Sequence, residues 1–342
     1  MKNWKKTTLI AVLTLCLLAG CAPAAANTEL DLSASYTEQA SDGEIDLSTV
    51  YTNQVTLENV VLEDEMVPLA ASAAVDTMLL PTASGKKVKS DGGAEIDYSN
   101  TGDGYVMARV SSKSGPRLKV QVLGPTTTYT YDLPRGSWAV FPLSDGNGNY
   151  TVRVMQNVQG SKYGMLTSVN FTLKLKDEFA PFLRPNQYVN YDGADNTISK
   201  AQELTGSLSN PLDKVQAVYD YVVGNLTYDQ QKAQTVQSGY LPDLDSVLAN
   251  KTGICFDYAA LMTGMLRSQG VPTKLVVGYA GQAYHAWVNV WTEETGWVDG
   301  VIFFDGTTWQ RMDPTFASSG NGSDAIMQYI GNGKNYTVKY LY

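Results

Sequence analysis

The residue types needed for acyl transfer by a thiol occur in the last third of this 342-residue chain. Cys255 lies in "KTGICFDYAALMTGMLRSQGVP", and the single histidine, His285, lies in "AYHAWVNVW". A thiolate nucleophile needs a nearby base, and the imidazole needs a third group that holds it in one tautomer. Asp313 in "WQRMDPTF" is the preferred third group, because Asp299 and Asp305 lie in "VDG" and "FDG", which look like turns. Together these residues predict a nucleophile, a general acid/base and an orienting carboxylate.

The residues around Cys255 predict a helix that begins close to the thiol. Thr252 is the expected N-cap, which makes Cys255 the third helical residue, and the helix should run to about Gln269. Gly270 and Pro272 then supply the usual stop signals. The positive end of the helix dipole favours a thiolate at this position.

The same helix start predicts where an oxyanion would be held. Backbone N–H groups at a helix N-terminus can stabilise a developing oxyanion, so we expect the N–H of Cys255 to serve as one donor. The side chain of Tyr240 is a candidate for a second donor. Alternation along the later strand places His285, Trp287 and Asn289 on one face.

The first 21 residues predict an export signal. Three lysines precede a short apolar run, Thr8 to Leu18, which is shorter than the about 20 residues of a membrane-spanning helix. The end of this segment, "LAGC", resembles the lipobox of bacterial lipoproteins. That resemblance implies cleavage before Cys21, acylation of Cys21 and anchoring of an extracytoplasmic protein to the cell membrane. A plain secretory signal is the alternative.

Cysteine usage and charge restrict the remaining possibilities. Cys16 lies in the signal and Cys21 is expected to carry lipid, so Cys255 has no partner for a disulfide in the mature chain. The mature chain has 22 Lys and Arg against 34 Asp and Glu, a charge of −12. This acidity argues against nucleic-acid partners. One cysteine and one histidine make a poor metal site, and we expect no metal and no cofactor.

Composition divides the rest of the chain into four parts. Residues 22–66 hold ten Asp or Glu and no Lys or Arg, which predicts a disordered acidic tether. Residues 67–178 predict an antiparallel β-sandwich of six or seven strands, because the sequence alternates with period two from about residue 85 to residue 178. Residues 179–196 are an irregular connector. Residues 197–342 predict an α+β domain, because helical patterns precede strand patterns there.

Six segments carry the strand prediction in the β-sandwich: "YVMARV", "LKVQVL", "TYTYDL", "WAVFPL", "YTVRVMQ" and "VNFTLKLK". They are short, rich in β-branched and aromatic residues, and separated by Gly, Pro, Asn and Asp. No catalytic constellation is visible among them. In the α+β part, Asn210 and Pro211 predict the start of a helix that ends near Gly224.

Three stretches of the α+β part resemble the core of the transglutaminase-like superfamily, whose fold is papain-like. They are "GICFDYAALMTGMLRSQGVPTKLVVGY", "AYHAWVNVWTEETGWV" and "WQRMDPTF". The resemblance covers roughly residues 197–318. It implies that Cys255 is the nucleophile, His285 the general acid/base and Asp313 the residue that orients the imidazole. Residues 293–310 make a longer connection than this family usually has.

The resemblance implies attack of a thiolate on an amide to form a thioester, which an amine or water then resolves. The expected substrates are surface proteins, peptides or peptidoglycan stem peptides. No carboxylate cluster like the calcium sites of the animal enzymes is visible. Two alternatives stay open at this point. The fold could serve as a non-catalytic surface binding module, or Cys255 could act alone as a redox sensor, although no resolving cysteine lies nearby.

Overall fold

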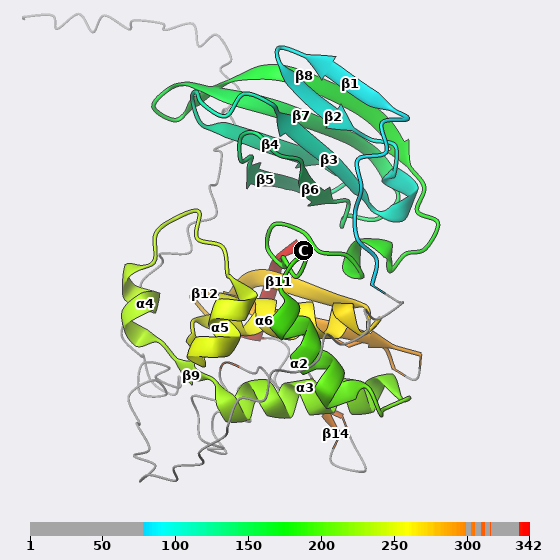
Figure 1. The fold of residues 1–342 in the computed structure, drawn as a ribbon, viewed down its shortest axis with the longest axis vertical. Coiled ribbons are helices and arrows are strands. Elements are labelled where there is room, and N and C mark those ends of the chain that lie inside the picture. Colours follow the sequence, from blue (N-terminus) through cyan, green and yellow to red (C-terminus); the bar gives the residue numbers. More distant parts are fainter. Residues whose placement is uncertain (1–77, 294, 299–301, 305–308, 312–314, 316–334) are drawn as a thin grey trace, which may run out of the picture.

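The computed structural model describes residues 78–293, 295–298, 302–304, 309–311, 315 and 335–342. The predicted export signal and the predicted tether, residues 1–21 and 22–66, lie outside this range, as does Cys21. Within the described residues, no helix combines the length and apolar character that crossing a membrane requires. Two units follow one another along the chain, a β-rich unit and a unit of helices packed on a sheet (Figure 1).

The β-rich unit consists of two four-stranded antiparallel sheets, with orders β1-β2-β3-β6 and β5-β4-β7-β8. Its strands are β1 Val88–Asp91, β2 Ala94–Asp97, β3 Tyr105–Val110, β4 Leu118–Leu123, β5 Thr128–Asp132, β6 Ala139–Pro142, β7 Gly148–Gln159 and β8 Lys162–Leu173. The sheets pack face to face over a shared apolar core that includes Ile96, Val120 and Val152. The predicted antiparallel β fold of this part of the chain is confirmed.

Alternation explains which face of each strand is buried. In β4, Leu118, Val120 and Val122 are buried, whereas the residues between them are partly exposed. The hairpin of β1 and β2 was not among the predicted strands. Its first strand, "VKSD", is exposed at all four positions, so no apolar alternation marks it. Gly92 and Gly93, both with positive φ, form the turn that pairs the two strands.

The described part of the second unit contains five α-helices. They are α2 Asp195–Thr205, α3 Pro211–Asn225, α4 Gln230–Thr235, α5 Leu244–Asn250 and α6 Cys255–Ser268, and a 3₁₀ turn at Ala180–Phe182 precedes them. The predicted start of α3 is confirmed, since the Asn210 side chain accepts a hydrogen bond from the N–H of Leu212 at 2.8 Å. Pro211 occupies the first helical position, where its missing N–H costs nothing.

The sheet of the second unit is antiparallel, with order β13-β12-β11-β16. Its strands are β11 Thr273–Ala280, β12 Ala283–Thr292, β13 Gly296–Val298 and β16 Tyr336–Leu341. β14 Ile302–Phe304 and β15 Trp309–Arg311 pair separately with each other. The strands predicted from "TKLVVGYA" and "AYHAWVNVWT" are confirmed as β11 and β12. Of the third predicted strand, "TTWQRMDP", the described part is β15.

Helix α6 lies between this sheet and the other helices (Figure 1). It packs against β11 and β12 on one side and against α2, α3 and α5 on the other. All 14 of its residues are buried, so α6 is a central helix with no solvent-facing side. Its N-terminal residue is Cys255, and the strand beside it, β12, carries His285.

A buried arginine anchors the other end of α6. The guanidinium of Arg267 donates to three backbone oxygens, those of Thr273 at 2.8 Å, Arg184 at 2.8 Å and Tyr342 at 2.6 Å. These acceptors belong to β11, to the connector and to the residue after β16. Burial lowers the pKa of Arg267 to about 10, so the side chain is still charged at neutral pH. One side chain therefore joins three segments that are distant in sequence.

A cluster of tyrosines joins the two units. Tyr131 on β5 lies with its ring centre 5.7 Å from that of Tyr188 in the connector and 5.8 Å from that of Tyr342. Tyr188 and Tyr342 stack at 4.0 Å. The apolar cores of the two units form one continuous cluster through these rings.

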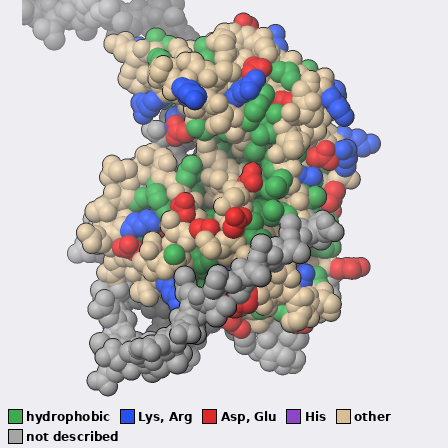
Figure 2. All heavy atoms as spheres, in the orientation of Figure 1, with side chains coloured by type: hydrophobic (Ala, Val, Ile, Leu, Met, Phe, Trp, Pro, Cys, Tyr) green, Lys and Arg blue, Asp and Glu red, His purple; other side chains and the backbone are tan. Residues whose placement is uncertain are grey.

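The two units differ in charge. Residues 78–178 contain twelve Lys and Arg and eight Asp and Glu, whereas residues 179–342 contain ten and fifteen. Figure 2 shows Lys and Arg side chains spread over the upper unit and several Asp and Glu side chains near the middle of the lower one. The acidity of the whole chain thus does not extend to the β-rich unit.

Candidate active site

Helix α6 begins at Cys255, so the prediction that Thr252 is the N-cap and Cys255 the third helical residue is wrong. Thr252 and Gly253 instead form a short strand, β10, which pairs in parallel with β9, Thr227–Tyr228. The N–H of Thr227 donates to the Lys251 carbonyl oxygen at 2.9 Å. Because Thr252 is held in extended pairing, it cannot cap α6, and Cys255 becomes the first helical residue.

A carboxylate inside the helix takes over the capping role. Ile254, the residue before α6, has no side-chain acceptor, but Asp257 at the third helical position reaches back to it. The Asp257 Oδ2 atom accepts a hydrogen bond from the N–H of Ile254 at 2.8 Å. This is the returning half of a capping box, and it fixes the first turn of the helix that carries Cys255.

Cys255 and His285 line the same cavity. This cavity has a volume of about 10 Å³, and its walls also include Tyr228, Ala233 and Tyr284. A space of that size holds about one water molecule. The thiol residue is 8% exposed and the histidine 1% exposed, so both lie just under the surface of the second unit. The structure thus brings together two of the residues that sequence analysis selected.

His285 is held on β12 by close packing across the sheet. Its ring is stacked beside that of Trp287, with centres 6.2 Å apart, as expected for residues on one face of a strand. Gly278 on β11 lies opposite His285. A Cβ atom on Gly278 would lie 2.0 Å from the Thr337 carbonyl oxygen and 2.8 Å from the Trp287 ring. Glycine is therefore required for the close approach that keeps Trp287 beside the imidazole.

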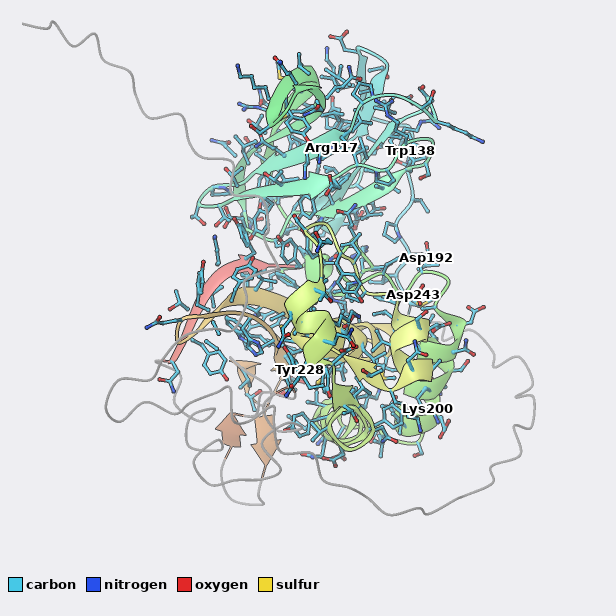
Figure 3. All side chains as sticks on the ribbon, turned by 90° about the vertical axis from the view of Figure 1, so that its left-hand side faces the viewer. Arg117, Trp138, Asp192, Lys200, Tyr228 and Asp243 are labelled. Carbon is cyan, nitrogen blue, oxygen red and sulfur yellow. The ribbon has the colours of Figure 1, made fainter. Side chains whose placement is uncertain are left out.

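Two tyrosines of the cavity were missed by sequence analysis. Tyr228 is placed by the pairing of β9 with β10, which sets it opposite Gly253, two residues before Cys255. It belongs to the second unit, as its label in Figure 3 shows. Tyr284 precedes His285, so simple alternation assigns it to the opposite face, yet both residues reach the cavity. The feature that places Tyr228 is the parallel pairing of two strands of two residues each, and no local sequence pattern reveals such a pairing.

Tyr284 keeps its proton at neutral pH. Burial raises the pKa of Tyr284 above its usual value of 10, and nearby Tyr340, Tyr188, Tyr279 and Cys255 add to the increase. A protonated phenol in the wall of the cavity is a hydrogen-bond donor, which is the type of group that an oxyanion requires.

Tyr240 is used elsewhere. Its hydroxyl donates to Oδ1 of Asp257 at 2.5 Å and accepts from Nζ of Lys232 at 2.7 Å. Desolvation raises the pKa of Tyr240, and the Asp257 carboxylate raises it further, so the phenol remains protonated. Its single proton is directed at Asp257, and the prediction that Tyr240 donates to an oxyanion gains no support from this arrangement.

Asp313 lies outside the described residues, as do Asp299 and Asp305. The role of Asp313 as the group that orients His285 therefore stays a prediction. In the part of the chain that the structure describes, no three His, Cys, Asp or Glu side chains gather in the way that metal ligands would. The expectations of no metal and no cofactor likewise stay predictions.

The family of the second unit follows from comparison with known proteins. Residues 198–314 match the family model for the transglutaminase-like superfamily core. The chain contains a transglutaminase-like superfamily domain. Its helices and antiparallel sheet, preceded along the chain by the antiparallel sheets of the β-rich unit, agree with the predicted fold class.

Two curated proteins resemble the chain that carries this transglutaminase-like domain. Uncharacterized protein YebA of Bacillus subtilis is 32% identical over 209 residues, which are 53% of this chain and 27% of YebA. The protein-glutamine gamma-glutamyltransferase of Pseudomonas aeruginosa is 32% identical over 68 residues, 16% of this chain and 10% of that protein. The chain thus spans about a quarter or less of the length of these relatives.

One solved structure matches the chain at low identity and with a low TM-score. It is the periplasmic domain of TgpA from Pseudomonas aeruginosa, bound to ethylmercury. The match has 17% identity and a TM-score of 0.31, and it covers 63% of this chain and 90% of that domain.

Proposed function

We propose that the transglutaminase-like domain is a thiol enzyme that acts on amide bonds through a thioester on Cys255. The observation that carries this proposal is that Cys255, at the first position of α6, and His285, on β12, line one cavity. A nucleophile and a base at one site are the minimum for acyl transfer by a thiol. The match of residues 198–314 to the family supports the same reaction class.

The reaction follows from the chemistry of these two side chains. The Cys255 thiolate attacks the amide carbonyl, and the carbon–nitrogen bond then breaks as protonated His285 gives its proton to the leaving nitrogen. The product is a thioester on Cys255 and an amine. A second amine or water next attacks the thioester, His285 removes its proton, and the Cys255 thiolate and protonated His285 are regenerated. Asp313 would keep the imidazole in the tautomer that this exchange requires.

The oxyanion has two sources of stabilisation in this proposal. Cys255 is the first residue of α6, and the first N–H groups of a helix point away from the helix's own carbonyls. The N–H of Cys255 is therefore suited to hold the oxygen of a tetrahedral intermediate. The phenols of Tyr228 and Tyr284 lie in the same cavity and are candidates for a second donor.

Location and substrates extend the proposal beyond the site. The lipobox-like "LAGC" supports a protein anchored to the outside of the cell membrane through acylated Cys21. Surface proteins, peptides and peptidoglycan stem peptides would be the amide substrates within reach of such an anchor. Transfer to an amine gives cross-linking, and transfer to water gives deamidation or hydrolysis.

Selective labelling of Cys255 tests the proposal. In the native protein, a thiol-reactive probe should label Cys255 rapidly at neutral pH. His285→Ala should slow labelling by up to about 10²-fold, because the base is lost. The decrease is smaller if the helix dipole alone keeps part of the thiol ionised. The labelled peptide between Lys251 and Arg267 identifies the site by mass. If labelling requires denaturant in the wild type and in His285→Ala alike, Cys255 is structural and the proposal fails.

The small volume of the cavity favours a second candidate, a non-catalytic surface module that uses the same fold for binding. A space of about 10 Å³ does not admit an amide substrate without movement of its walls. Capture of cell-wall peptides by the wild type and by Cys255→Ala separates the two functions. Equal capture with no amide turnover supports binding, whereas turnover that is lost in Cys255→Ala supports the enzyme.

A further inference from the structure

Asp257 is a fully buried carboxylate in the first turn of α6, two residues after Cys255. Its exposed fraction is 0%. A buried carboxylate is stable only where donors replace its lost water. Three donors do so here: the Ile254 N–H at 2.8 Å, the Lys232 Nζ atom at 2.7 Å and the Tyr240 hydroxyl.

The sequence leaves just enough room for this carboxylate. Gly253 lies against it, and a Cβ atom on Gly253 would be 2.5 Å from the Asp257 Cβ atom. Any side chain at residue 253 would therefore push Asp257 away from the helix start. Glycine at this position is explained by the space that Asp257 needs.

Lys232 supplies the countercharge from a different element. Its ammonium group lies 4.3 Å from the ring centre of Tyr240 and bonds to both Tyr240 and Asp257. Lys232 belongs to α4, and the next residue, Ala233, lines the cavity of Cys255. The Lys232–Asp257 ion pair thus ties a wall of the cavity to the start of the helix that carries the thiol.

We propose that Lys232 is a positioning residue for Cys255: it cancels the charge of Asp257, two residues after the thiol, and holds α4 against the cavity. The inference rests on the proposed function. An uncompensated anion near Cys255 would oppose ionisation of the thiol, whereas the ion pair leaves the first turn of α6 nearly neutral. Among the described residues, the other titratable groups at this cavity are His285 and Tyr284 from β12 and Tyr228 from β9.

The pH dependence of Cys255 alkylation tests the inference on the full chain. Iodoacetamide is the probe, and the mass of the peptide between Lys251 and Arg267 reports the reaction at Cys255. Lys232→Met should raise the pH of half-maximal rate by about one unit, which is about a tenfold slower reaction below that pH. Asp257→Asn should lower this pH. The double variant, Lys232→Met with Asp257→Asn, should return it to the wild-type value, because both charges are then absent.

Lys200→Met is the matched control. Lys200 also pairs with a carboxylate of the second unit, Glu203, but this pair is on the surface of α2. Its label in Figure 3 lies well apart from that of Tyr228. Loss of this cation should leave the pH of half-maximal alkylation unchanged. Lys232→Arg, which retains the charge, should stay close to the wild type.

The results separate the inference from the proposed function. If Lys232→Met is folded by circular dichroism and reacts with the wild-type pH profile, Lys232 is only structural and the inference is overturned. If Lys232→Met does not fold, Asp257→Asn is compared with the double variant, because these two proteins also differ only in the charge of Lys232. Equal pH profiles of alkylation would then overturn the inference. If the native wild type does not react between pH 5 and 9, both the inference and the proposed function fail.

Discussion

Close packing fixes the positions of Cys255 and His285, the two residues that carry the proposed reaction. His285 is kept beside Trp287, and this arrangement depends on the absence of a side chain at Gly278. The pairing of β11 with β16 shifts register between Val277 and Gly278, at the same place. At the scale of single residues, the site therefore depends on Gly278, which takes no part in the proposed reaction but leaves space for Trp287 beside His285.

Gly278→Ala should destabilise the protein by about 2–4 kcal/mol, because the new Cβ atom would collide with backbone rather than with a movable side chain. The nearest atom, the Thr337 carbonyl oxygen, would be only 2.0 Å away. Urea denaturation monitored by circular dichroism measures the change.

Gly224→Ala is the control, since a Cβ atom there meets nothing within 4 Å in helix α3. It should be neutral or stabilising by up to about 1 kcal/mol. Equal effects of the two substitutions would contradict this account.

Helix α6 is held at both ends by buried charged side chains. Asp257 binds the backbone N–H of Ile254 at its start, and Arg267 binds three carbonyl oxygens at its end. Between them the helix is mostly apolar, and all of its residues are buried. A helix without a solvent-facing side gains no orientation from amphipathicity, so these polar anchors define where its ends lie.

Arg267→Met should lower the free energy of unfolding by about 3–5 kcal/mol, because three backbone oxygens, two of them in buried hydrogen bonds, would lose their donor. The midpoint of urea denaturation measures this loss. Arg117→Met is the matched control, since Arg117 is exposed and should change stability by about 0.5 kcal/mol or less. A small effect of Arg267→Met would show that water replaces the guanidinium, contrary to its burial.

At the scale of the whole molecule, buried tyrosines form the contact between the two units. Burial raises the pKa of Tyr129, Tyr131, Tyr188 and Tyr342 above the usual value of 10. These rings join the β-rich unit to the transglutaminase-like domain, so their protonation state bears on how the units hold together.

Stability should fall steeply above pH 10. A phenol whose pKa is raised on folding contributes its full stabilisation below the unfolded-state value of 10, and the contribution is lost as the pH rises above that value. Each such tyrosine should cost about 1.4 kcal/mol per pH unit in this range. Urea midpoints at pH 8, 10 and 11 measure the slope. A flat profile between pH 10 and 11 would contradict the burial of these phenols.

Tyr131→Phe isolates one contribution. The Tyr131 hydroxyl is buried and has no hydrogen-bond partner among the described residues. Its removal should therefore leave stability at pH 8 unchanged or raise it by about 1 kcal/mol. Above pH 10, the variant should lose about 1.4 kcal/mol less per pH unit than the wild type. A large loss at pH 8 would mean that the hydroxyl has a partner.

Local patterns predicted much of the fold. Asn210 and Pro211 marked the start of α3, Gly270 and Pro272 marked the end of α6, and alternation identified β11 and β12. The start of α6 was misplaced because a threonine is a good cap only when its backbone is available. The backbone of Thr252 is instead paired with β9, and Asp257 caps the start of α6 in place of Thr252. The exposed strand β1 was missed because it has no apolar face to read.

The sequence by itself determined that one thiol would lie near a helix start and that one imidazole would lie on a later strand. Those features depend on residues a few positions apart, whose propensities and periodicity can be read directly. Only the tertiary structure decided that Cys255 and His285 share a cavity, that Tyr228 and Tyr284 complete its walls, and that Lys232 reaches Asp257. Such contacts join residues 25 to 57 positions apart, and they depend on how the packed helices and sheet exclude water, which no local pattern records.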